Sequence, residues 1–363
     1  MNRDLTTGPI RRSLILFSLP LIAGNLLQQL YNIVDTLIVG QFLGSVALAA
    51  VGSAFSLMIL LNSLVLGLCM GSGVVFSQLY GEGALDAMKT AMVNAFGAIA
   101  LFSLLLEGVS YALLPQLLRL LRVPQEAVHD LSDYLLVIFS GIFFSFLYHF
   151  FAVALRSVGN SLASLLFSLL STLLNIALDL LFVLSFHWGV AGAALATVIA
   201  QAVSALGLVA YAVFRLPVLR VNRRHMRFSA PLLRRIGSVS VLTSLQQSIM
   251  NFGILLIQSL VNSFGISVMA AFAAGVKIDA FAYSPAQDFA NGFATFVAQN
   301  AGAGKKDRLM QGIRDAALLS LSLCAAVSVL VALFARPLLT LFIDPSQEEI
   351  LQIGMHYLRT EGV

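Results

Sequence analysis

Charged residues are scarce in this chain of 363 residues: Lys, Arg, Asp and Glu make up 10% of it, whereas 59% of its residues are hydrophobic. A soluble domain normally has about 25% charged residues, so this sequence has too few charged residues to cover the surface of a soluble globular domain. Cysteine is equally rare, and Cys69 and Cys324 both lie within apolar segments. The shortage of charge excludes an ordinary soluble protein, and the two cysteines indicate neither a disulfide framework nor a zinc site.

Long apolar runs are what the sequence has instead. About 20 apolar residues are enough for a helix to cross the hydrocarbon core of a bilayer. Runs of this kind recur along the chain between charged or Gly/Pro-rich breaks, so the predicted fold class is an all-α integral membrane protein. The predicted helices cover residues 13–42, 46–79, 90–114, 131–155, 162–186, 189–214, 235–264, 267–300 and 312–335, with part of a tenth from about residue 348.

The distribution of Lys and Arg predicts the orientation, because cytoplasmic loops of membrane proteins carry an excess of basic residues. With the N-terminus inside, 16 basic residues fall on the cytoplasmic side and 3 on the other. The densest basic segment, residues 215–234, then lies in the cytoplasm after six helices. We therefore predict a multi-pass protein of the cell membrane with a cytoplasmic N-terminus.

Two parts of the chain repeat each other in register: GSVALAAV at 44–51 aligns with GISVMAAF at 265–272, and GSGVVFSQLYGEGALD at 71–86 with GFATFVAQNAGAGKKD at 292–307. One fixed offset relates both pairs of segments, which indicates a duplication. Both repeats begin on the same side, so they are parallel, as in transporters whose substrate path lies between two halves. The identical pairs include Gly71/Gly292, Gln78/Gln299, Gly81/Gly302, Gly83/Gly304, Asp86/Asp307 and Pro124/Pro345.

The repeat predicts an N-terminal six-helix lobe at 1–214, a basic cytoplasmic linker at 215–234 and an incomplete C-terminal lobe at 235–363. Residue 363 corresponds to residue 142 of the first repeat, so the part of the first lobe at 143–214, with two further helices, has no counterpart. We therefore expect a C-terminally truncated chain with nine helices and a partial tenth. The complete form is expected to have two parallel six-helix bundles and twelve helices.

Four polar residues lie at similar depth in the predicted first lobe. Asp35 and Asp179 are each about 7 residues from the outer ends of their helices and Thr197 is 8 residues into the next, which is roughly 10–12 Å below the outer surface at 1.5 Å per residue. Asn175 shares a helix face with Asp179. Intramembrane acids are functional by default, and two nearby carboxylates favour binding of a proton or cation. The alternative is that they only bond neighbouring helices.

The predicted helix 267–300 carries secondary candidates. Lys277 and Asp288 are 11 residues apart, about three turns, so they share a face but cannot pair along the helix. Pro285 predicts a kink or local unwinding between them. Gln258, in the preceding helix, is a weaker candidate. The alternative is that these groups face a water-filled cleft without a specific role.

Other motifs favour simpler explanations. The segment NAGAGKKD lacks the spacing of a phosphate-binding loop, and the five histidines show no ligand spacing. We therefore expect no enzyme, no cofactor and no metal site, apart from Na⁺ at Asp35, Asn175, Asp179 and Thr197. Topology and anionic lipid explain the basic linker better than nucleic acid does.

Four segments together resemble the multidrug and toxic compound extrusion (MATE) family, in its bacterial multidrug branch. They are SLPLIAGNLLQQLYNIVDTLIVGQFLG in the first helix, NIALD in the fifth, GVAGAALATVIAQ in the sixth and FVAQNAGAGK after the eighth. The resemblance implies two six-helix bundles that export organic cations in exchange for H⁺ or Na⁺. It also implies that the family's coupling residues fall on Asp35, Asn175, Asp179 and Thr197. Acids that some members carry in the seventh and tenth helices have no clear match here.

The predicted function is thus secondary active antiport of organic cations or drugs, by a monomer in the lipid bilayer. The drug is expected in a cleft between the halves, lined by the aromatic residues Tyr31, Phe144, Tyr148 and Phe281. One alternative is a flippase for lipid-linked oligosaccharides, which would need several basic residues in the cleft, where only Lys277 qualifies. A membrane enzyme or receptor is a third hypothesis, and no nucleophile, metal or nucleotide motif supports it.

Overall fold

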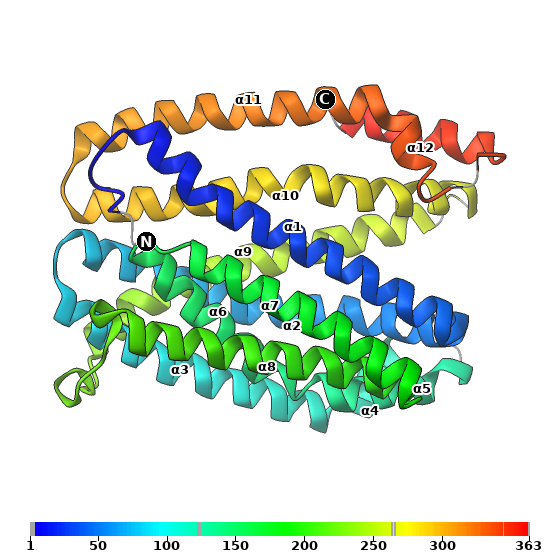
Figure 1. The fold of residues 1–363 in the computed structure, drawn as a ribbon, viewed down its shortest axis with the longest axis horizontal. Coiled ribbons are helices and arrows are strands. Elements are labelled where there is room, and N and C mark those ends of the chain that lie inside the picture. Colours follow the sequence, from blue (N-terminus) through cyan, green and yellow to red (C-terminus); the bar gives the residue numbers. More distant parts are fainter. Residues whose placement is uncertain (1–3, 122–124, 263, 265, 344, 362–363) are drawn as a thin grey trace.

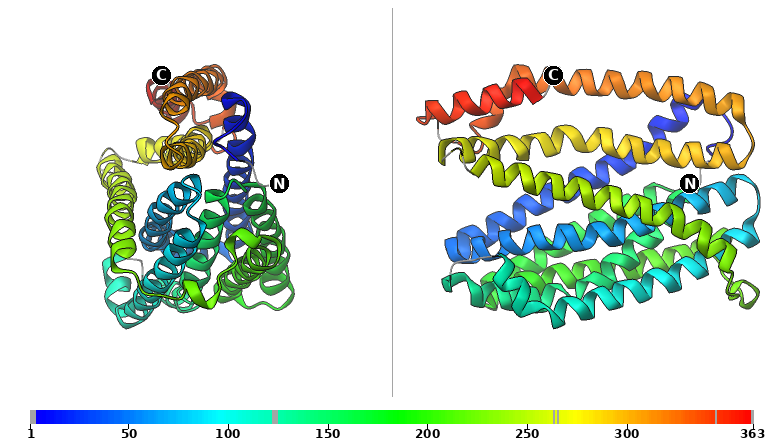
Figure 2. Two further views of the ribbon diagram at one scale, coloured as in Figure 1. Left: turned by 90° about the vertical axis from the view of Figure 1, so that its left-hand side faces the viewer. Right: turned by 180° about the vertical axis from the view of Figure 1, so that it is seen from behind.

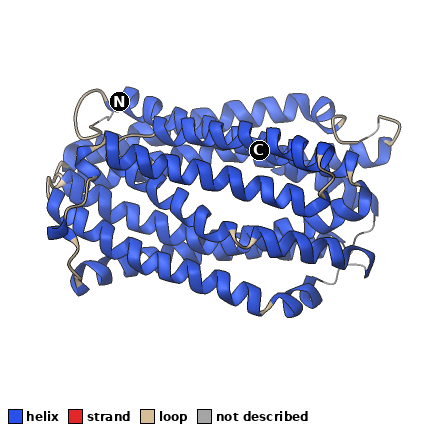
Figure 3. Ribbon diagram, turned by 60° about the horizontal axis from the view of Figure 1, so that its bottom comes forward, coloured by secondary structure: helices blue, strands red, loops and turns tan. Residues whose placement is uncertain are grey.

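A computed structural model describes residues 4–121, 125–262, 264, 266–343 and 345–361. Within these residues every regular element is helical (Figure 3). The elements in chain order (Figure 1) are α1 (Ile10–Phe42), α2 (Gly44–Gly81), α3 (Leu85–Ala112), α4 (Leu114–Leu121), α5 (Gln125–Ile138), α6 (Gly141–Ser157), α7 (Leu162–Asp179), the π-helical η1 (Leu180–Ser185), α8 (Gly189–Arg215), the short 3₁₀ helices η2 (Pro217–Leu219) and η3 (Arg223–His225), α9 (Ala230–Asn262), α10 (Ile266–Gly302), α11 (Lys306–Leu339) and α12 (Glu348–Glu361).

The long helices confirm the predicted fold class of an all-α membrane protein. Six of them, α1, α2, α3, α7 with η1, α8 and α11, are long and apolar enough to cross a membrane, and α5 with α6 makes a seventh span if the pair is counted as one. α9 and α10 run alongside these helices over similar lengths (Figure 2). Both carry charged residues, Arg234 and Arg235 in α9 and Lys277, Asp279 and Asp288 in α10.

Two local predictions differ from the structure. The predicted helix 131–155 is divided at Ser140–Gly141 into α5 and α6, which are bent by 46°, and such Gly/Ser pairs are a common cause of kinks. α10 stays helical through Pro285, so the predicted unwinding there is wrong. The backbone leaves helical geometry instead at Phe334 in α11, shortly before Pro337.

The helices form two groups, and one long helix from each repeat lies between these groups. α2 to α8 make up one bundle and α10 to α12 a second layer, while α1 and α9 lie on opposite flanks between them (Figure 2). The first half of α1 buries Leu14 and Phe17 in a core with Phe289 and Phe296 of α10. Its second half buries Ile38 in the large core of the first bundle.

The contact between α2 and α9, here called the α2–α9 seam, depends on two glycines one turn apart. A Cβ atom at Gly67 would lie 2.3 Å from the Cα of Ser244, and one at Gly71 would lie 2.3 Å from the Cα of Ser240. The serine hydroxyls donate across the seam, from Ser240 to the carbonyl of Leu68 at 3.0 Å and from Ser244 to that of Leu64 at 3.1 Å. Small residues spaced by four let membrane helices approach this closely.

The contact between α1 and α10, the α1–α10 seam, is the counterpart of the first. Here a Cβ atom at Gly292 would lie 2.4 Å from the hydroxyl oxygen of Ser18. One turn earlier on α10, the carboxylate of Asp288 interacts with the side chain of Asn25 on α1. This seam therefore joins the halves with polar side chains rather than with backbone contact alone.

At one end of the bundle, here called the basic end, lie the N-terminal segment, the α2–α3 and α10–α11 turns and the α8–α9 connection (left in Figure 1). The two repeats meet there symmetrically: a Cβ at Gly81 would lie 2.0 Å from the carbonyl oxygen of Gln299, and one at Gly302 would lie 2.0 Å from that of Gln78. Only glycine permits such an approach of two backbones.

Two segments outside the long helices also join the halves. Each segment packs on the half opposite to the repeat whose long helix follows it. The N-terminal segment lies on the second half, where the Leu5 N–H donates to Gln299 Oε1 at 3.2 Å and the Lys305 ammonium donates to the Thr6 carbonyl at 2.8 Å. The α8–α9 connection lies on α3 of the first half, where His225 Nε2 is 3.0 Å from the Asp86 carboxylate. Each repeat therefore holds the segment that leads into the long helix lying between the halves.

Candidate functional site

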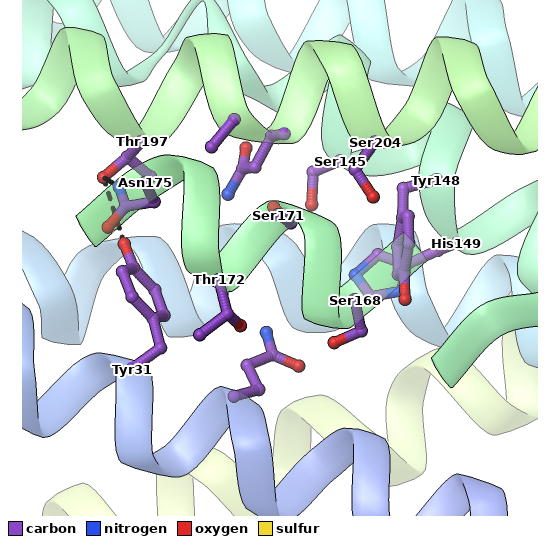
Figure 4. A pocket seen from close by; sticks show the side chains of 13 residues that line it. Tyr31, Ser145, Tyr148, His149, Ser168, Ser171, Thr172, Asn175, Thr197 and Ser204 are labelled. Atoms are coloured by element: carbon purple, nitrogen blue, oxygen red, sulfur yellow. Dashed lines mark hydrogen bonds between the residues drawn. The ribbon is translucent and has the colours of Figure 1, made fainter. Parts of the chain in front are cut away.

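A polar cavity lies inside the first bundle, enclosed by α1, α6, α7 and α8 (Figure 4). Its volume is about 80 Å³, enough for a few water molecules but small for a drug. The residues that line it include Gln28, Tyr31, Ser145, Tyr148, His149, Ser168, Ser171, Thr172, Asn175, Thr197, Gln201 and Ser204.

Helical spacing explains why these polar side chains converge. On α7 they stand at residues 168, 171, 172 and 175, and on α8 at 197, 201 and 204. Residues three or four apart share one face of a helix, so each helix presents a polar stripe to the cavity and apolar residues elsewhere. The same spacing places Gln28, Tyr31 and Asp35 on one face of α1.

Two of the predicted ion-site residues, Asn175 and Thr197, form a hydrogen-bonded group with Tyr31 at one end of this cavity (Figure 4). The Thr197 hydroxyl donates to the Ala193 carbonyl at 3.1 Å. It therefore accepts from Asn175 Nδ2 at 3.2 Å and from the Tyr31 hydroxyl at 3.1 Å. Because its amide nitrogen is used in this way, the side-chain oxygen of Asn175 has no partner among the described residues.

The two predicted acids lie beside this group and beside each other. Their carboxyls are close enough to interact directly, although they belong to α1 and α7. Asp179 is fully buried, and neither of its carboxyl oxygens has a hydrogen-bond partner among the described residues. One oxygen of Asp35 is likewise buried and without a partner. The structure thus brings Asp35, Asn175, Asp179 and Thr197 together.

Asp179 also marks a change in helix geometry. α7 ends at this residue, and the chain continues as the π-helix η1 over Leu180–Ser185. Short π-helical segments are rare and frequently occur at functional sites. The wider helix here follows directly on Asp179, which is fully buried beside the hydrogen-bonded group.

The predicted cleft residues fall in different places. Tyr31 and Tyr148 line the cavity of the first bundle rather than a space between the halves. Phe144 packs against Phe143, with ring centroids 6.2 Å apart, at the edge of the large core. Phe281 is half-buried on α10 and lines neither of the two cavities described here.

The secondary candidates are also separated. Lys277 is exposed, with its ammonium 5.7 Å from the centre of the Phe342 ring. Asp288 is 8% exposed and lies in the α1–α10 seam. The side chain of Gln258 lies outside the described residues.

A second cavity, of about 250 Å³, lies between the halves. It is enclosed by α2 and α6 of the first bundle and by α9 and α10. The sequence predicted a cleft between the halves but none of the residues that line this cavity, and it did not indicate His149 and Gln28 in the first one. The signal for the missed residues was present as polar side chains three or four apart on α1, α6, α7 and α8.

Comparisons with known proteins agree with this architecture. The MatE family model matches residues 20–181 and 243–361. Probable multidrug resistance protein YpnP of Bacillus subtilis is 30% identical, over 98% of this chain and 79% of YpnP. Probable multidrug resistance protein NorM of Thermotoga maritima is 25% identical, over 95% of this chain and 74% of NorM.

A solved structure has the same fold. It is the outward-facing conformation of a multidrug resistance MATE family transporter of the MOP superfamily, with a TM-score of 0.92 at 24% identity. The match covers 99% of this chain and 80% of that one. The chain therefore belongs to the MatE family of membrane transporters, the multidrug and toxic compound extrusion family that its sequence motifs resemble.

Proposed function

We propose that the chain is a secondary active multidrug efflux antiporter, which exchanges organic cations and other xenobiotics for H⁺ or Na⁺ by alternating access. Membership of the MatE family supports transport, and relatives such as YpnP and NorM carry the name of multidrug resistance proteins. The two cavities support separate binding sites, one for the ion in the first bundle and one for the cargo between the halves.

One observation carries the ion site: when both acids are ionised, four buried oxygens, of Asp35, Asp179 and Asn175, have no hydrogen-bond donor among the residues that the structure describes. Leaving a buried acceptor unpaired costs about 1–3 kcal/mol, and more when it is charged. A proton on one carboxyl, or a Na⁺ among the oxygens, removes this cost, because small hard cations prefer oxygen ligands. No resident cofactor is needed, since the coupling ion itself is cargo.

Ion binding can expel a drug only through a difference in affinity between two conformations. The site spans α1 and α7, and α1 is the helix that runs from the second half into the first bundle. A cation that draws Asp35 and Asp179 together acts on the position of α1 against α7. In this proposal, movement of α1 changes the space between the halves and releases the drug.

The alternative of a lipid-linked oligosaccharide flippase is less well supported. Its cargo carries a diphosphate, which several Arg or Lys residues would have to hold. Among the described residues that line the cavity between the halves, Arg156 is the only basic one. A single guanidinium suits a single acidic group better than a diphosphate.

The test is transport in proteoliposomes, with a pH gradient or a sodium gradient imposed separately and efflux of a fluorescent organic cation as the readout. Asp35→Asn removes one carboxylate of the site, so we expect coupled efflux to fall to background. Glu107→Gln is the matched control, because Glu107 is an acid in α3 that lines neither cavity.

The gradient that drives efflux identifies the coupling ion. Loss of coupling in Asp35→Asn alone, with Glu107→Gln active, supports the proposal. Undiminished coupled efflux in Asp35→Asn would refute the ion site at Asp35, and Asp288 would then be the next acid to substitute. Absence of cation efflux under either gradient would instead favour the flippase.

A further inference from the structure

The cavity between the halves contains a half-buried arginine. Arg156 reaches it from the end of α6, and the flanking Leu155 and Ser157 are buried. The other polar groups around the cavity are uncharged amides and hydroxyls, from α2, α9 and α10. They include Thr243 and Gln247 of α9 and Gln287 and Asn291 of α10.

The guanidinium of Arg156 has no hydrogen bond and no ion pair with any residue that the structure describes. A charged side chain that is largely removed from water is normally paired. Arg156, whose guanidinium has five donors in a planar fork, instead lines a space of about 250 Å³. That geometry fits a carboxylate, which a guanidinium can bind through two parallel hydrogen bonds.

The nearest opposite charge is on α10. Asp288 interacts electrostatically with Arg156, but beyond ion-pair distance, and its carboxylate is also close to Asn25 and Asn291. One of its oxygens is buried without a partner. Asp288 lies at the edge of the cavity, since its neighbours Gln287 and Asn291 line it. The cavity thus has a cation on the side of one half and an acid on the side of the other.

We propose that this cavity is a subsite for the carboxylate of an amphipathic organic molecule, with Arg156 as the residue that recognises it. The inference rests on the proposed function in so far as that molecule is transported cargo. Amide and hydroxyl groups of Thr243, Gln247 and Asn291 supply further hydrogen bonds. Asp288 disfavours a ligand that is anionic only, so the best ligand carries a carboxylate and a positive charge.

The first cavity does not compete for this role. Its volume of about 80 Å³ is a third of that of the second, and Arg156 does not line it. The second cavity is also bounded by both halves, so a molecule bound there contacts α6 and α10 at once. Its carboxylate would give Arg156 the close ion-pair partner that Asp288 on α10 does not provide, which ties occupancy to the spacing of the halves.

The test compares two dyes that differ in a single group. Rhodamine 110 has a free carboxylate and a positive charge, and rhodamine 123 is its methyl ester. Binding of each dye to the purified full chain in lipid nanodiscs is measured by fluorescence anisotropy. We expect the unmodified chain to bind rhodamine 110 more tightly than rhodamine 123.

Arg156→Gln should weaken rhodamine 110 by about tenfold, the usual size of one lost charge-assisted contact, and leave rhodamine 123 unchanged. Arg156→Lys should retain part of the preference, because the charge remains but the planar fork is lost. Arg215→Gln is the matched control, since Arg215 stands in the last turn of α8 outside the cavity. Retained rhodamine 123 binding shows that each variant is folded.

Equal affinity of the two dyes for the unmodified chain would overturn the proposal. Equal weakening of both dyes in Arg156→Gln would also overturn it and give the residue a structural role. The result is independent of the ion site: binding that depends on Arg156 supports the subsite even if coupled efflux under ion gradients is not found.

Discussion

The two seams that join the halves are related by the repeat but built differently. The offset that pairs Gly71 with Gly292 also pairs Gly67 with Asp288. On the α2–α9 seam both positions are glycine, and backbone meets backbone. On the α1–α10 seam one glycine remains, and an acid occupies the other position.

This difference shows how one duplicated contact can take two roles. The α2–α9 seam has little room for anything except two helices and the hydroxyls of Ser240 and Ser244, so it acts as a structural clamp. The α1–α10 seam holds Asp288 and Asn25 close to the cavity of Arg156. The first seam positions the halves, and the second is free to carry chemistry.

The largest expected effect comes from breaking the clamp with Gly71→Ala. The new Cβ would lie 2.3 Å from the Cα of Ser240, so a helix must move rather than a side chain. We expect a loss of about 1–3 kcal/mol of stability, the usual cost of overpacking. Thermal unfolding followed by fluorescence-detected gel filtration measures this.

Gly97→Ala is the matched control for that variant. A Cβ at Gly97 meets nothing within 4 Å, and Ala is the better helix former, so this variant should be as stable as the unmodified chain or more so. Equal destabilisation by the two variants would show that the α2–α9 seam is not a clamp.

A second prediction concerns the contact that the repeats share at the basic end. Gly81→Ala would bring a Cβ to 2.0 Å from the Gln299 carbonyl oxygen and should push the halves apart there. The reporter is a cysteine at Ser77, which is 2% exposed and lines the second cavity, in a Cys324→Ala background. We expect its labelling by a water-soluble maleimide to rise about tenfold, which corresponds to ~1.4 kcal/mol. An unchanged labelling rate would mean that this contact does not close the end.

A smaller effect is expected from Gly292→Ala in the α1–α10 seam. Its Cβ would lie 2.4 Å from the hydroxyl oxygen of Ser18, a side chain that can rotate and that has no hydrogen bond to any residue the structure describes. We expect a cost below about 1.5 kcal/mol, close to that of one changed rotamer, in the same unfolding assay. Ser18→Ala added to Gly292→Ala should restore stability, and a cost equal to that of Gly71→Ala would remove the distinction between the seams.

The smallest effect is the pH dependence of the N-terminal segment beside the α1–α10 seam. Burial acts to raise the pKa of Asp4, but hydrogen bonds from Thr6 and Thr7 and the charge of Lys305 outweigh it, so this pKa is lowered. A lowered folded-state pKa stabilises the docked segment above the unfolded value of about 3.9, and the gain is lost as pH falls through the folded value.

Hydrogen exchange of the Leu5 amide reports this docking, because that N–H is bonded to Gln299. Protection should fall when the pH is lowered to 3. In Asp4→Asn protection should already be lower at pH 7 and should change less with pH. An equal loss of protection in both proteins would assign the pH dependence to other groups.

Much of the fold could be predicted from the sequence, because apolar length and the fixed repeat are properties of the chain itself. The positions of the helix breaks and the contacts of the two seams could not be predicted from it. The division at Ser140–Gly141 depends on how α5 and α6 pack, and the α2–α9 seam depends on glycines of the first half meeting serines of a helix that follows the linker.

The candidate site divides in the same way. The depth of Asp35, Asp179 and Thr197 follows from counting along helices, so their proximity was predictable. Arg156 appears in the sequence only as a basic residue near a helix end, which is typical of a cytoplasmic charge. The side chains that enclose it come from α9 and α10, and no local pattern connects them with α6.

The paired contacts of Gly81 with Gln299 and of Gly302 with Gln78 have a consequence for control of the basic end. Both are made by peptide groups, which do not titrate and carry no net charge for salt to screen. Because each half supplies one glycine and one carbonyl, neither contact can part without straining the other. Pressure, temperature and ligands in the cavities can therefore open this pair of contacts directly. Acid and ionic strength can affect the pair only through charged or titratable groups elsewhere in the molecule.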